Sequence, residues 1–253
     1  MKFARFFYHG KSFYGILDNK IHPVTGDIFG EFQISLEGFK PEEVKLLPPC
    51  QPSKIILVGL NYLDHVKESQ SSNVVPGEPV LFMKPSTSVI GPDETIFYPE
   101  GVERLDFEAE LAVVIKDRCK TLTPSSVPSH ILGFTCLNDV TARNLQRKDV
   151  QWTRAKSFDS FCPLGPFIVD KIDASNSKIQ SYLNGKLCQS SNTSRMIFSV
   201  DKIVSFVSQV MTLLPGDVIS TGTPSGVGPM QPGDTVEIFI ENIGTLRNYV
   251  KKA

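Results

Sequence analysis

The sequence has few cysteines, and none of them forms a Cys-x-x-Cys pair. The five are scattered along the 253 residues: Cys50, Cys119, Cys136, Cys162 and Cys188. Structural zinc sites and disulfide frameworks both need regularly spaced cysteines, so neither is predicted here. A chain of this length buries most of the apolar surface that it exposes when unfolded, and its stability therefore needs no covalent cross-link.

Long apolar runs are also missing. The N-terminus, MKFARFFYHGKSFYG, lacks the continuous hydrophobic segment of a signal peptide, and no stretch is long enough to span a bilayer. We therefore expect a cytoplasmic protein without a membrane partner. Neither sign of charge dominates, since 26 basic residues stand against 27 acidic ones. Without a basic excess, nucleic acid is not expected as a partner.

Two common catalytic motifs are absent. There is no Gly-x-Ser-x-Gly motif, which argues against a serine nucleophile of the α/β-hydrolase kind. The glycine-rich stretch Thr223–Gly228 lacks the lysine of a P-loop and does not open a helix as a dinucleotide site does. We interpret it as a turn whose backbone amides, with the Thr223 hydroxyl, receive a substrate carboxylate.

The chain is expected to form two parts, a small β-rich N-terminal domain over residues 1–50 and a larger domain over residues 51–253. Short apolar runs broken by turn residues predict the strands of the first part: Lys2–Tyr8, Ser12–Leu17 and Ile28–Ile34. The proline-rich stretch Leu47–Pro52 is the expected linker.

Strands outnumber helices in the larger part. The predicted strands are Lys54–Gly59, Val80–Met83, Asp106–Ile115, Val218–Ser220, Thr235–Ile240 and Leu246–Val250. Helices are predicted over Asn138–Lys148 and, from its amphipathic spacing, over Val200–Leu213. Because strands and helices do not alternate regularly, the pattern favours an α+β or mixed β architecture over a doubly wound sheet.

A pair of glutamates, Glu108 and Glu110, is the most informative local feature. In a strand these two side chains share one face, where two like charges repel each other unless a cation lies between them. The simpler interpretation is that both face water, as glutamates usually do. The apolar continuation Leu111–Ile115 favours burial of the strand instead.

A third carboxylate, Asp139, follows the predicted strand end Thr135–Asn138. It could cap a helix that starts at Val140, and capping alone would explain it. Together with the glutamates, however, it would make an all-carboxylate set without histidine. Such a set suits a hard cation, Mg²⁺ or Mn²⁺, and not zinc.

Six short runs, in this order, give the chain a family resemblance. They are Gly59–His65, Phe82–Pro85, Asp106–Ile115, Asn138–Arg143, Ala155–Phe158 and Thr221–Pro224. Together they resemble the fumarylacetoacetate hydrolase family, over roughly residues 50–250, and the N-terminal part is similar to that of bacterial members. The resemblance implies a mixed β-sandwich roll, a homodimer, and one divalent metal per active site.

The resemblance also implies roles for individual residues. Glu108, Glu110 and Asp139 correspond to the metal ligands. His65 and Glu68 correspond to a catalytic dyad on a segment that covers bound ligand, and Lys156 is the third catalytic candidate. Substrate-binding roles fall on Lys84, Arg143, Gln146 and Thr223. One departure is Asn144, where many relatives have an aspartate after the arginine.

These residues suit chemistry on an enolate. A 2-oxo acid can chelate a metal through its carboxylate and keto oxygens, and the metal then acts as a Lewis acid. Lys84, Lys156 and Arg143 could pair with carboxylates or oxyanions, and Glu68 could orient His65 for proton transfer or water activation. We expect first the hydrolysis of a 2,4-dioxo acid of the acylpyruvate or fumarylpyruvate type.

Three alternatives stay open at this point. One is isomerisation or decarboxylation of an unsaturated hydroxy-dioate of the 2-hydroxyhepta-2,4-diene-1,7-dioate type in aromatic catabolism. Another is tautomerisation or decarboxylation of oxaloacetate. The third is a metabolite-binding protein without activity. The expected partner in every case is a small 2-oxo or 2,4-dioxo acid.

Overall fold

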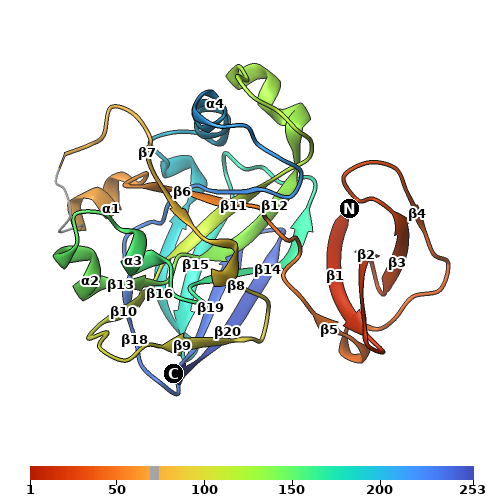
Figure 1. Ribbon diagram of the computed structural model, residues 1–253, viewed down its shortest axis with the longest axis horizontal. Coiled ribbons are helices and arrows are strands. Elements are labelled where there is room, and N and C mark those ends of the chain that lie inside the picture. Colours follow the sequence, from red (N-terminus) through yellow and green to blue (C-terminus); the bar gives the residue numbers. More distant parts are fainter. Residues whose placement is uncertain (69–73) are drawn as a thin grey trace.

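The computed structural model describes residues 1–68 and 74–253, and of Glu68 only the backbone. In this part of the chain most residues in regular structure belong to strands, and the helices are few and short (Figure 1). The predicted strand-rich architecture is confirmed. No helix among the described residues is long and apolar enough to cross a membrane.

The N-terminal strands form a meander. It consists of β1 (Lys2–Tyr8), β2 (Lys11–Leu17), β3 (Ile21–Gly26) and β4 (Phe32–Ile34), followed by the 3₁₀ turn η1 (Pro41–Glu43) and β5 (Lys45–Leu46). The first two predicted strands are confirmed, but the predicted strand Ile28–Ile34 is wrong over its first half. There Asp27 accepts a hydrogen bond from the Gly30 amide, and the chain turns back toward β3. The strand β3 was missed.

The meander is joined to the rest of the chain through its first strand. Residues Lys2 and Phe3 of β1 pair with Val169 and Ile168 of β14 (Cys162–Val169), so β1 continues a sheet of the larger part. In Figure 1 the other N-terminal strands lie to one side of that sheet.

The larger part begins with elements that lead to the acidic residues. They are β6 (Ile55–Gly59), α1 (Leu63–Glu68), β7 (Val80–Lys84), η2 (Ser86–Ser88), β8 (Val89–Ile90), β9 (Thr95–Tyr98), β10 (Leu105–Phe107) and β11 (Ala109–Ile115). The middle of the chain then contains η3 (Pro124–His130), β12 (Ile131–Asn138), β13 (Thr141–Ala142), α2 (Arg143–Lys148) and α3 (Thr153–Lys156). After β14 come β15 (Lys178–Leu183), β16 (Lys186–Asn192), η4 (Thr193–Arg195), α4 (Val200–Val210), β17 (Val218–Ser220), β18 (Gly228–Met230), β19 (Thr235–Ile240) and β20 (Gly244–Lys252).

Among the described residues the strands form one large sheet and two smaller ones. The large sheet has the order β4-β3-β2-β1-β14-β12-β11-β17-β6-β7, and the others have the orders β13-β10-β18 and β16-β15-β19-β20-β9. The large sheet and the five-stranded sheet are mixed, because β17 pairs with β6, and β20 with β9, in parallel while most pairs are antiparallel. This mixture of parallel and antiparallel pairs differs from the parallel sheet of a doubly wound fold.

Two predictions around the acidic residues need correction. The predicted strand Asp106–Ile115 is two strands, β10 and β11, which belong to different sheets and are separated at Glu108. The predicted helix Asn138–Lys148 begins only at Arg143, and the residue before it, Ala142, provides no side-chain cap. Asp139 is therefore not a helix cap, which removes the simpler interpretation of that carboxylate.

The core lies between the large sheet and its neighbours. Strand β11 is buried along its whole length, and residues of β12, β19 and α4 belong to the same apolar cluster. The short helices α1, α2 and α3 lie together on the side of the molecule away from the N-terminal strands (Figure 1). The break between β10 and β11 faces these helices through the contacts described next.

Candidate metal centre and active site

Three carboxylates converge at the break between β10 and β11. Glu108 is the residue at the break, Glu110 is the second residue of β11, and Asp139 directly follows β12. One ligand atom from each lies within 4.8 Å of the others. Their exposed fractions are 4%, 1% and 0%, respectively, so all three are removed from bulk water. Buried like charges at this separation need compensation by cations.

Strand pairing brings these residues together. Strands β11 and β12 are antiparallel neighbours, and Ala109 lies opposite Asn138, so the start of β11 meets the end of β12. The Asp139 amide donates to the Glu108 carbonyl at 2.9 Å, and the Glu108 amide donates to Asn138 Oδ1 at 2.9 Å. The backbone thus fixes two of the three carboxylates independently of any ligand.

Glu110 is held from a third strand. Ser220, at the end of β17, donates a short hydrogen bond to Glu110 Oε2, and the Gly222 amide donates to the same oxygen at 3.1 Å. Burial raises the pKa of Glu110 well above its ordinary value, and the charges of Asp139 and Glu108 raise it further. Negative charge at Glu110 is therefore only partly compensated by the protein.

Two cationic side chains bridge the cluster. Lys156 Nζ lies 3.0 Å from Glu108 Oε2 and 2.5 Å from Asp139 Oδ2, and Arg143 Nη2 lies 2.5 Å from Glu108 Oε1. Burial alone would lower the pKa of Lys156, but the attraction of Asp139 and Glu108 outweighs it and the net shift is upward. The ion pairs with Asp139 and Glu108 therefore favour the protonated form of Lys156.

Arg143 is in turn oriented by Asp106, a fully buried residue of β10. Arg143 Nε donates to Asp106 Oδ2 at 2.9 Å, and Arg104 binds the same carboxylate from the other side through Nε at 2.8 Å. Arg143 Nη1 donates to Gln146 Oε1 at 2.7 Å. The guanidinium therefore has little rotational freedom, and its charge is directed toward Glu108.

Lys84 lies behind the cluster. Its ammonium donates to the carbonyls of Val140, Lys156 and Phe161 at 2.9, 2.7 and 2.8 Å, and it forms an ion pair with Asp139 Oδ1 at 2.8 Å. An ammonium has three protons, and these contacts use all of them. The expected substrate contact of Lys84 thus becomes, in our proposal, a positioning role toward Asp139.

The histidine candidate is on the helix α1. His65 is 9% exposed and lines the same pocket as the carboxylates. The start of α1 is fixed by Asn61, whose amide donates to the Thr221 carbonyl at 2.7 Å and accepts from the Phe198 amide at 2.7 Å. The side chain of Glu68, the proposed partner of His65, lies outside the described part of the structure.

Thr223 is part of the tight turn that follows β17. Gly222 has φ 93°, and a Cβ at this position would lie 2.9 Å from Asn61 Cβ and 3.0 Å from the Val58 carbonyl oxygen. Only glycine fits, because both the backbone conformation and the available space exclude a side chain. The turn presents the Thr223 hydroxyl to the pocket.

Gln189 of β16 is a site residue that the sequence did not reveal. It is fully buried, accepts from the Ala109 amide at 3.0 Å, and donates to Thr223 Oγ1 and to the Pro224 carbonyl, both at 2.8 Å. It therefore ties the backbone between the two glutamates to the Thr223 turn. No local pattern signals such a residue, because its partners are 80 and 34 positions away.

The pocket over the carboxylates is small, with a volume of about 30 Å³. Besides the candidates, five apolar residues line it: Val58, Gly59, Leu60, Phe82 and Trp152. The candidates in the lining are His65, Glu108, Glu110, Asp139, Arg143, Gln146, Lys156 and Thr223. The two aromatic residues were not predicted. Nearly all sequence-derived candidates thus meet in one place.

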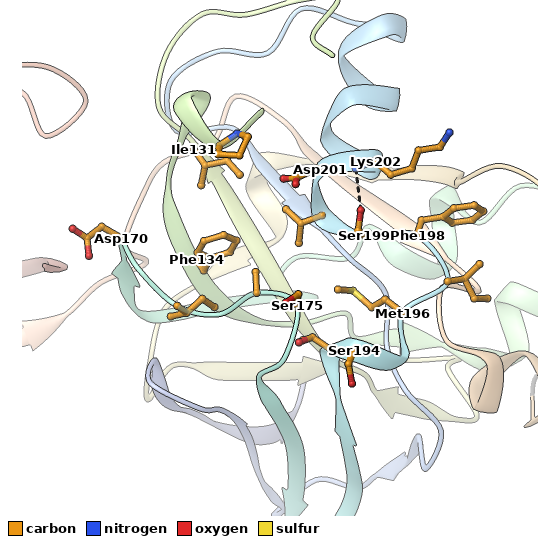
Figure 2. A pocket seen from close by; sticks show the side chains of 16 residues that line it. Ile131, Phe134, Asp170, Ser175, Ser194, Met196, Phe198, Ser199, Asp201 and Lys202 are labelled. Atoms are coloured by element: carbon orange, nitrogen blue, oxygen red, sulfur yellow. Dashed lines mark hydrogen bonds between the residues drawn. The ribbon is translucent and has the colours of Figure 1, made fainter. Parts of the chain in front are cut away.

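A wider cavity, about 630 Å³, lies elsewhere and contains none of the candidates. Figure 2 shows it between Phe134, Met196 and Phe198, with the start of α4 on one side. Its lining is mainly apolar and offers no group of carboxylates or cations comparable to the smaller pocket. The chemistry of the side chains, not the size of the cavity, therefore identifies the candidate active site.

The residues fit a hard divalent cation. Every candidate ligand atom is a carboxylate oxygen, as Mg²⁺ and Mn²⁺ prefer. Two buried polar atoms beside the ligands, the Tyr62 hydroxyl and Asn138 Nδ2, have no hydrogen-bond partner in the part of the chain described here. Buried atoms of this kind normally bond to ordered water or to a ligand.

Comparison with known proteins finds two family matches along the chain. The family described as fumarylacetoacetate (FAA) hydrolase C-terminal matches residues 54–251, and the family described as Rv2993c-like, N-terminal, matches residues 1–49. The chain is 42% identical to the mitochondrial oxaloacetate tautomerase FAHD2B of Bos taurus, over 83% of this chain and 70% of that protein.

Two solved structures share the fold over the whole chain. The 5-carboxymethyl-2-hydroxymuconate delta-isomerase from Mycobacterium smegmatis is 40% identical with a TM-score of 0.93, and 100% of each chain is covered. Maleylpyruvate hydrolase from Sphingobium sp. SYK-6, solved with manganese (II) ion and pyruvate, is 26% identical with a TM-score of 0.82, and 100% of each chain is covered. Similar proteins thus include a tautomerase, an isomerase and a hydrolase.

Proposed function

The chain belongs to the fumarylacetoacetate hydrolase family, and we propose that it is a divalent-metal-dependent enzyme that forms and protonates the enolate of a small, dianionic 2-oxo acid. Among the reactions of its relatives, keto–enol tautomerisation of oxaloacetate is the one that the site supports best. The observation that carries this proposal is the balance of charge within a small pocket.

Among the side chains that the structure describes, the formal charges at the site cancel when every carboxylate is ionised and every cation is protonated. These side chains are the carboxylates of Asp106, Glu108, Glu110 and Asp139 and the cations Lys84, Arg104, Arg143 and Lys156, and all of them except Glu110 are joined by ion pairs. A bound divalent cation would leave the site with two excess positive charges. A dianionic substrate restores neutrality, whereas a monoanion leaves one buried charge unpaired.

The metal would be held by Glu108, Glu110 and Asp139, and we propose Mg²⁺ or Mn²⁺. When bound, such an ion supplies Lewis acidity that favours negative charge on a neighbouring keto oxygen. The protein supplies the remaining functions. Arg143 and Lys156 are the cations that line the pocket, so they are placed to bind the substrate carboxylates by charge-assisted hydrogen bonds.

Proton transfer falls to His65 in this proposal. Lys156 is unsuited to act as the base, because the net upward shift of its pKa keeps it protonated at neutral pH. It can instead donate a hydrogen bond to the enolate oxygen. His65 lines the pocket, and an imidazole can remove and return a proton near neutral pH. Glu68, three residues further on the same helix, is proposed to orient it.

The size of the pocket favours the shortest of the dianionic candidates. Its volume of about 30 Å³, roughly the share of one water molecule, must expand to admit any of them, and the expansion is smallest for the shortest chain. Oxaloacetate carries both negative charges on a four-carbon chain, whereas fumarylpyruvate and the heptadienedioates are longer. Charge favours a dianion and size favours a short one, and we therefore propose oxaloacetate.

The test is a spectrophotometric assay of the enol form of oxaloacetate. With Mg²⁺ present, the purified protein should speed the disappearance of the enol, and excess chelator should remove the effect. A His65→Ala variant with unchanged Mg²⁺ affinity should lose most of the acceleration. If the enol decays at the uncatalysed rate while other 2-oxo acids turn over, the tautomerase proposal is wrong.

Hydrolysis of a 2,4-dioxo acid is the second candidate. It is favoured by the spacing of His65 and Glu68 on one helical turn, which suits activation of water. Incubation with acylpyruvates and fumarylpyruvate separates the two reactions, since only a hydrolase releases pyruvate and a second acid. Carbon dioxide release from oxaloacetate would reveal decarboxylation in the same experiment.

A further inference from the structure

We propose that Trp152 determines substrate length, so that the pocket accepts four-carbon dicarboxylates and excludes acylpyruvates with longer chains. This inference rests on the proposed function and adds a residue that limits its substrate range. It follows from how the indole ring is placed against Gly59, Phe82 and the turn that bears Lys156.

Trp152 and Lys156 belong to one turn of the chain. Trp152 precedes α3, and its carbonyl accepts a hydrogen bond from the Lys156 amide at 3.1 Å. Lys156 is the last residue of α3, and its ammonium reaches Glu108 and Asp139. The indole is therefore held at a fixed offset from the cation that binds the reacting end of the substrate. Both residues line the pocket.

Phe82 supports the indole from β7. The two rings are 5.3 Å apart between centroids and nearly perpendicular, with an interplanar angle of 76°. Edge-to-face contact of this kind is favourable beyond the area that it buries. Lys156 Nζ lies over the same Phe82 ring at 4.9 Å from the centroid. Phe82 thus contacts both the indole and the ammonium, and it couples their positions.

Gly59, at the end of β6, provides the space for the indole. A Cβ added to Gly59 would lie 3.0 Å from Trp152 Cζ3 and 3.2 Å from Cη2. The ring therefore lies directly against the backbone of β6 and cannot move further in that direction. The φ angle of Gly59 is not positive, so its backbone conformation does not require glycine. The absence of a side chain instead leaves room for the indole ring.

These contacts make Trp152 a rigid wall of the small pocket. A longer substrate chain that meets the indole cannot push it toward β6, because Gly59 blocks that path. Truncating the indole enlarges the cavity by far more than its present volume of about 30 Å³. The expected consequence is a gain in binding and turnover of longer chains relative to oxaloacetate.

The experiment compares Trp152→Ala with wild type and with Val150→Ala. Val150 is a matched control, because it precedes the same turn, is 94% exposed and does not line the pocket. We expect Trp152→Ala to shift the ratio of kcat/KM for an acylpyruvate to kcat/KM for oxaloacetate by about tenfold or more, as pocket contacts of this size do. Val150→Ala should leave the ratio unchanged.

A purely structural role for Trp152 predicts a different result. Loosening of α3 would displace Lys156 and lower kcat/KM for both substrates by the same factor, so an unchanged ratio overturns the inference. Binding is measured in parallel, by calorimetry with Mg²⁺ and either oxalate or an acylpyruvate. If wild type turns over neither substrate, the proposed function fails, and the ratio of the two affinities still decides whether Trp152 limits length.

Gly59→Ala provides an independent test of the contact itself. Its new methyl group should push the indole into the pocket and weaken oxalate binding. In the Trp152→Ala background the same substitution should have almost no effect, because the ring that it displaces is gone. Equal effects of Gly59→Ala in both backgrounds would mean that the two residues do not act through each other.

Discussion

Replacing Lys84 with methionine is expected to destabilise the protein by about 3 kcal/mol when no metal is present. Methionine fills a similar volume but leaves three buried carbonyls and the Asp139 carboxylate without the ammonium that they share. Removing one partner from a buried ion pair typically costs about 3–5 kcal/mol. We use the lower end, because burial lowers the pKa of Lys84 more than Asp139 raises it, so desolvation of the ammonium already offsets part of its attraction.

The assay is urea unfolding at neutral pH in the presence of chelator. The transition midpoint should fall while the slope of the free energy against urea stays unchanged, which shows that the compactness of both states is preserved. Lys45→Met is the matched control. Lys45 also forms an ion pair, with Glu94, but its side chain is 59% exposed, and such surface pairs contribute about 1 kcal/mol or less.

Saturating Mg²⁺ adds a second measurement to the same variant. A cation held by Glu108, Glu110 and Asp139 would neutralise part of the negative charge of Asp139 in place of Lys84. The loss in free energy of unfolding caused by Lys84→Met should therefore become smaller. The reasoning is refuted if Lys84→Met costs no more than Lys45→Met in chelator. It is also refuted if Lys84→Met keeps full stability but abolishes substrate binding, because Lys84 would then contact substrate and not position Asp139.

Three further predictions concern the site. Because the pKa of Glu110 is raised in the folded state above its ordinary value of 4.5, ionisation of Glu110 destabilises the metal-free fold as the pH rises past 4.5. Glu110→Gln should therefore raise the urea midpoint at pH 8 but not at pH 4, and remove Mg²⁺-dependent activity. A lower midpoint at pH 8 would contradict this. Asp106→Asn frees Arg143, so it should raise KM by about tenfold and change kcat less, and equal losses in both would argue against positioning. His65→Ala should lower kcat by about 10²–10⁴-fold with unchanged Mg²⁺ affinity by calorimetry, and an unchanged kcat would exclude His65 as the base.

Much of the site could be predicted because its chemistry is local in sequence. Glu108 and Glu110 are two positions apart, and the apolar run after them correctly indicates that the strand is buried. Asp139 could be placed beside them only through the six runs of the family resemblance, because the antiparallel pairing of β11 with β12 is not visible in either segment alone. The roles of these residues, the domain boundary at residue 50 and the homodimer remain predictions.

What could not be predicted depends on distant contacts. Gln189 and Trp152 carry no local signature, and their positions follow from the pairing of β16 with β15 and from the contact of Trp152 with β6. Strand β3 was missed because Pro23 interrupts its apolar pattern. Such a proline lowers strand propensity in the sequence, although pairing with β2 and β4 overrides it in the fold. The helix predicted from Asn138 begins only at Arg143. Before it, the Asp139 amide is hydrogen-bonded to the Glu108 carbonyl, and Thr141 and Ala142 form strand β13.

The positions of Lys84 and Lys156 indicate why the carboxylates are not simply a cation trap. If metal affinity alone were favoured, three buried carboxylates without lysines would bind a dication more tightly. The two ammonium groups lower the affinity of the site for a metal ion, since both already pair with Asp139. In return, the site with a bound dication would attract a dianion, and loss of both would restore the balanced set of ion pairs. Binding of metal and of substrate should therefore be mutually reinforcing, and oxalate should raise Mg²⁺ affinity by the same factor by which Mg²⁺ raises oxalate affinity. Calorimetric titrations in both orders measure the two factors, and Mg²⁺ binding that is indifferent to oxalate would refute this account of the charges.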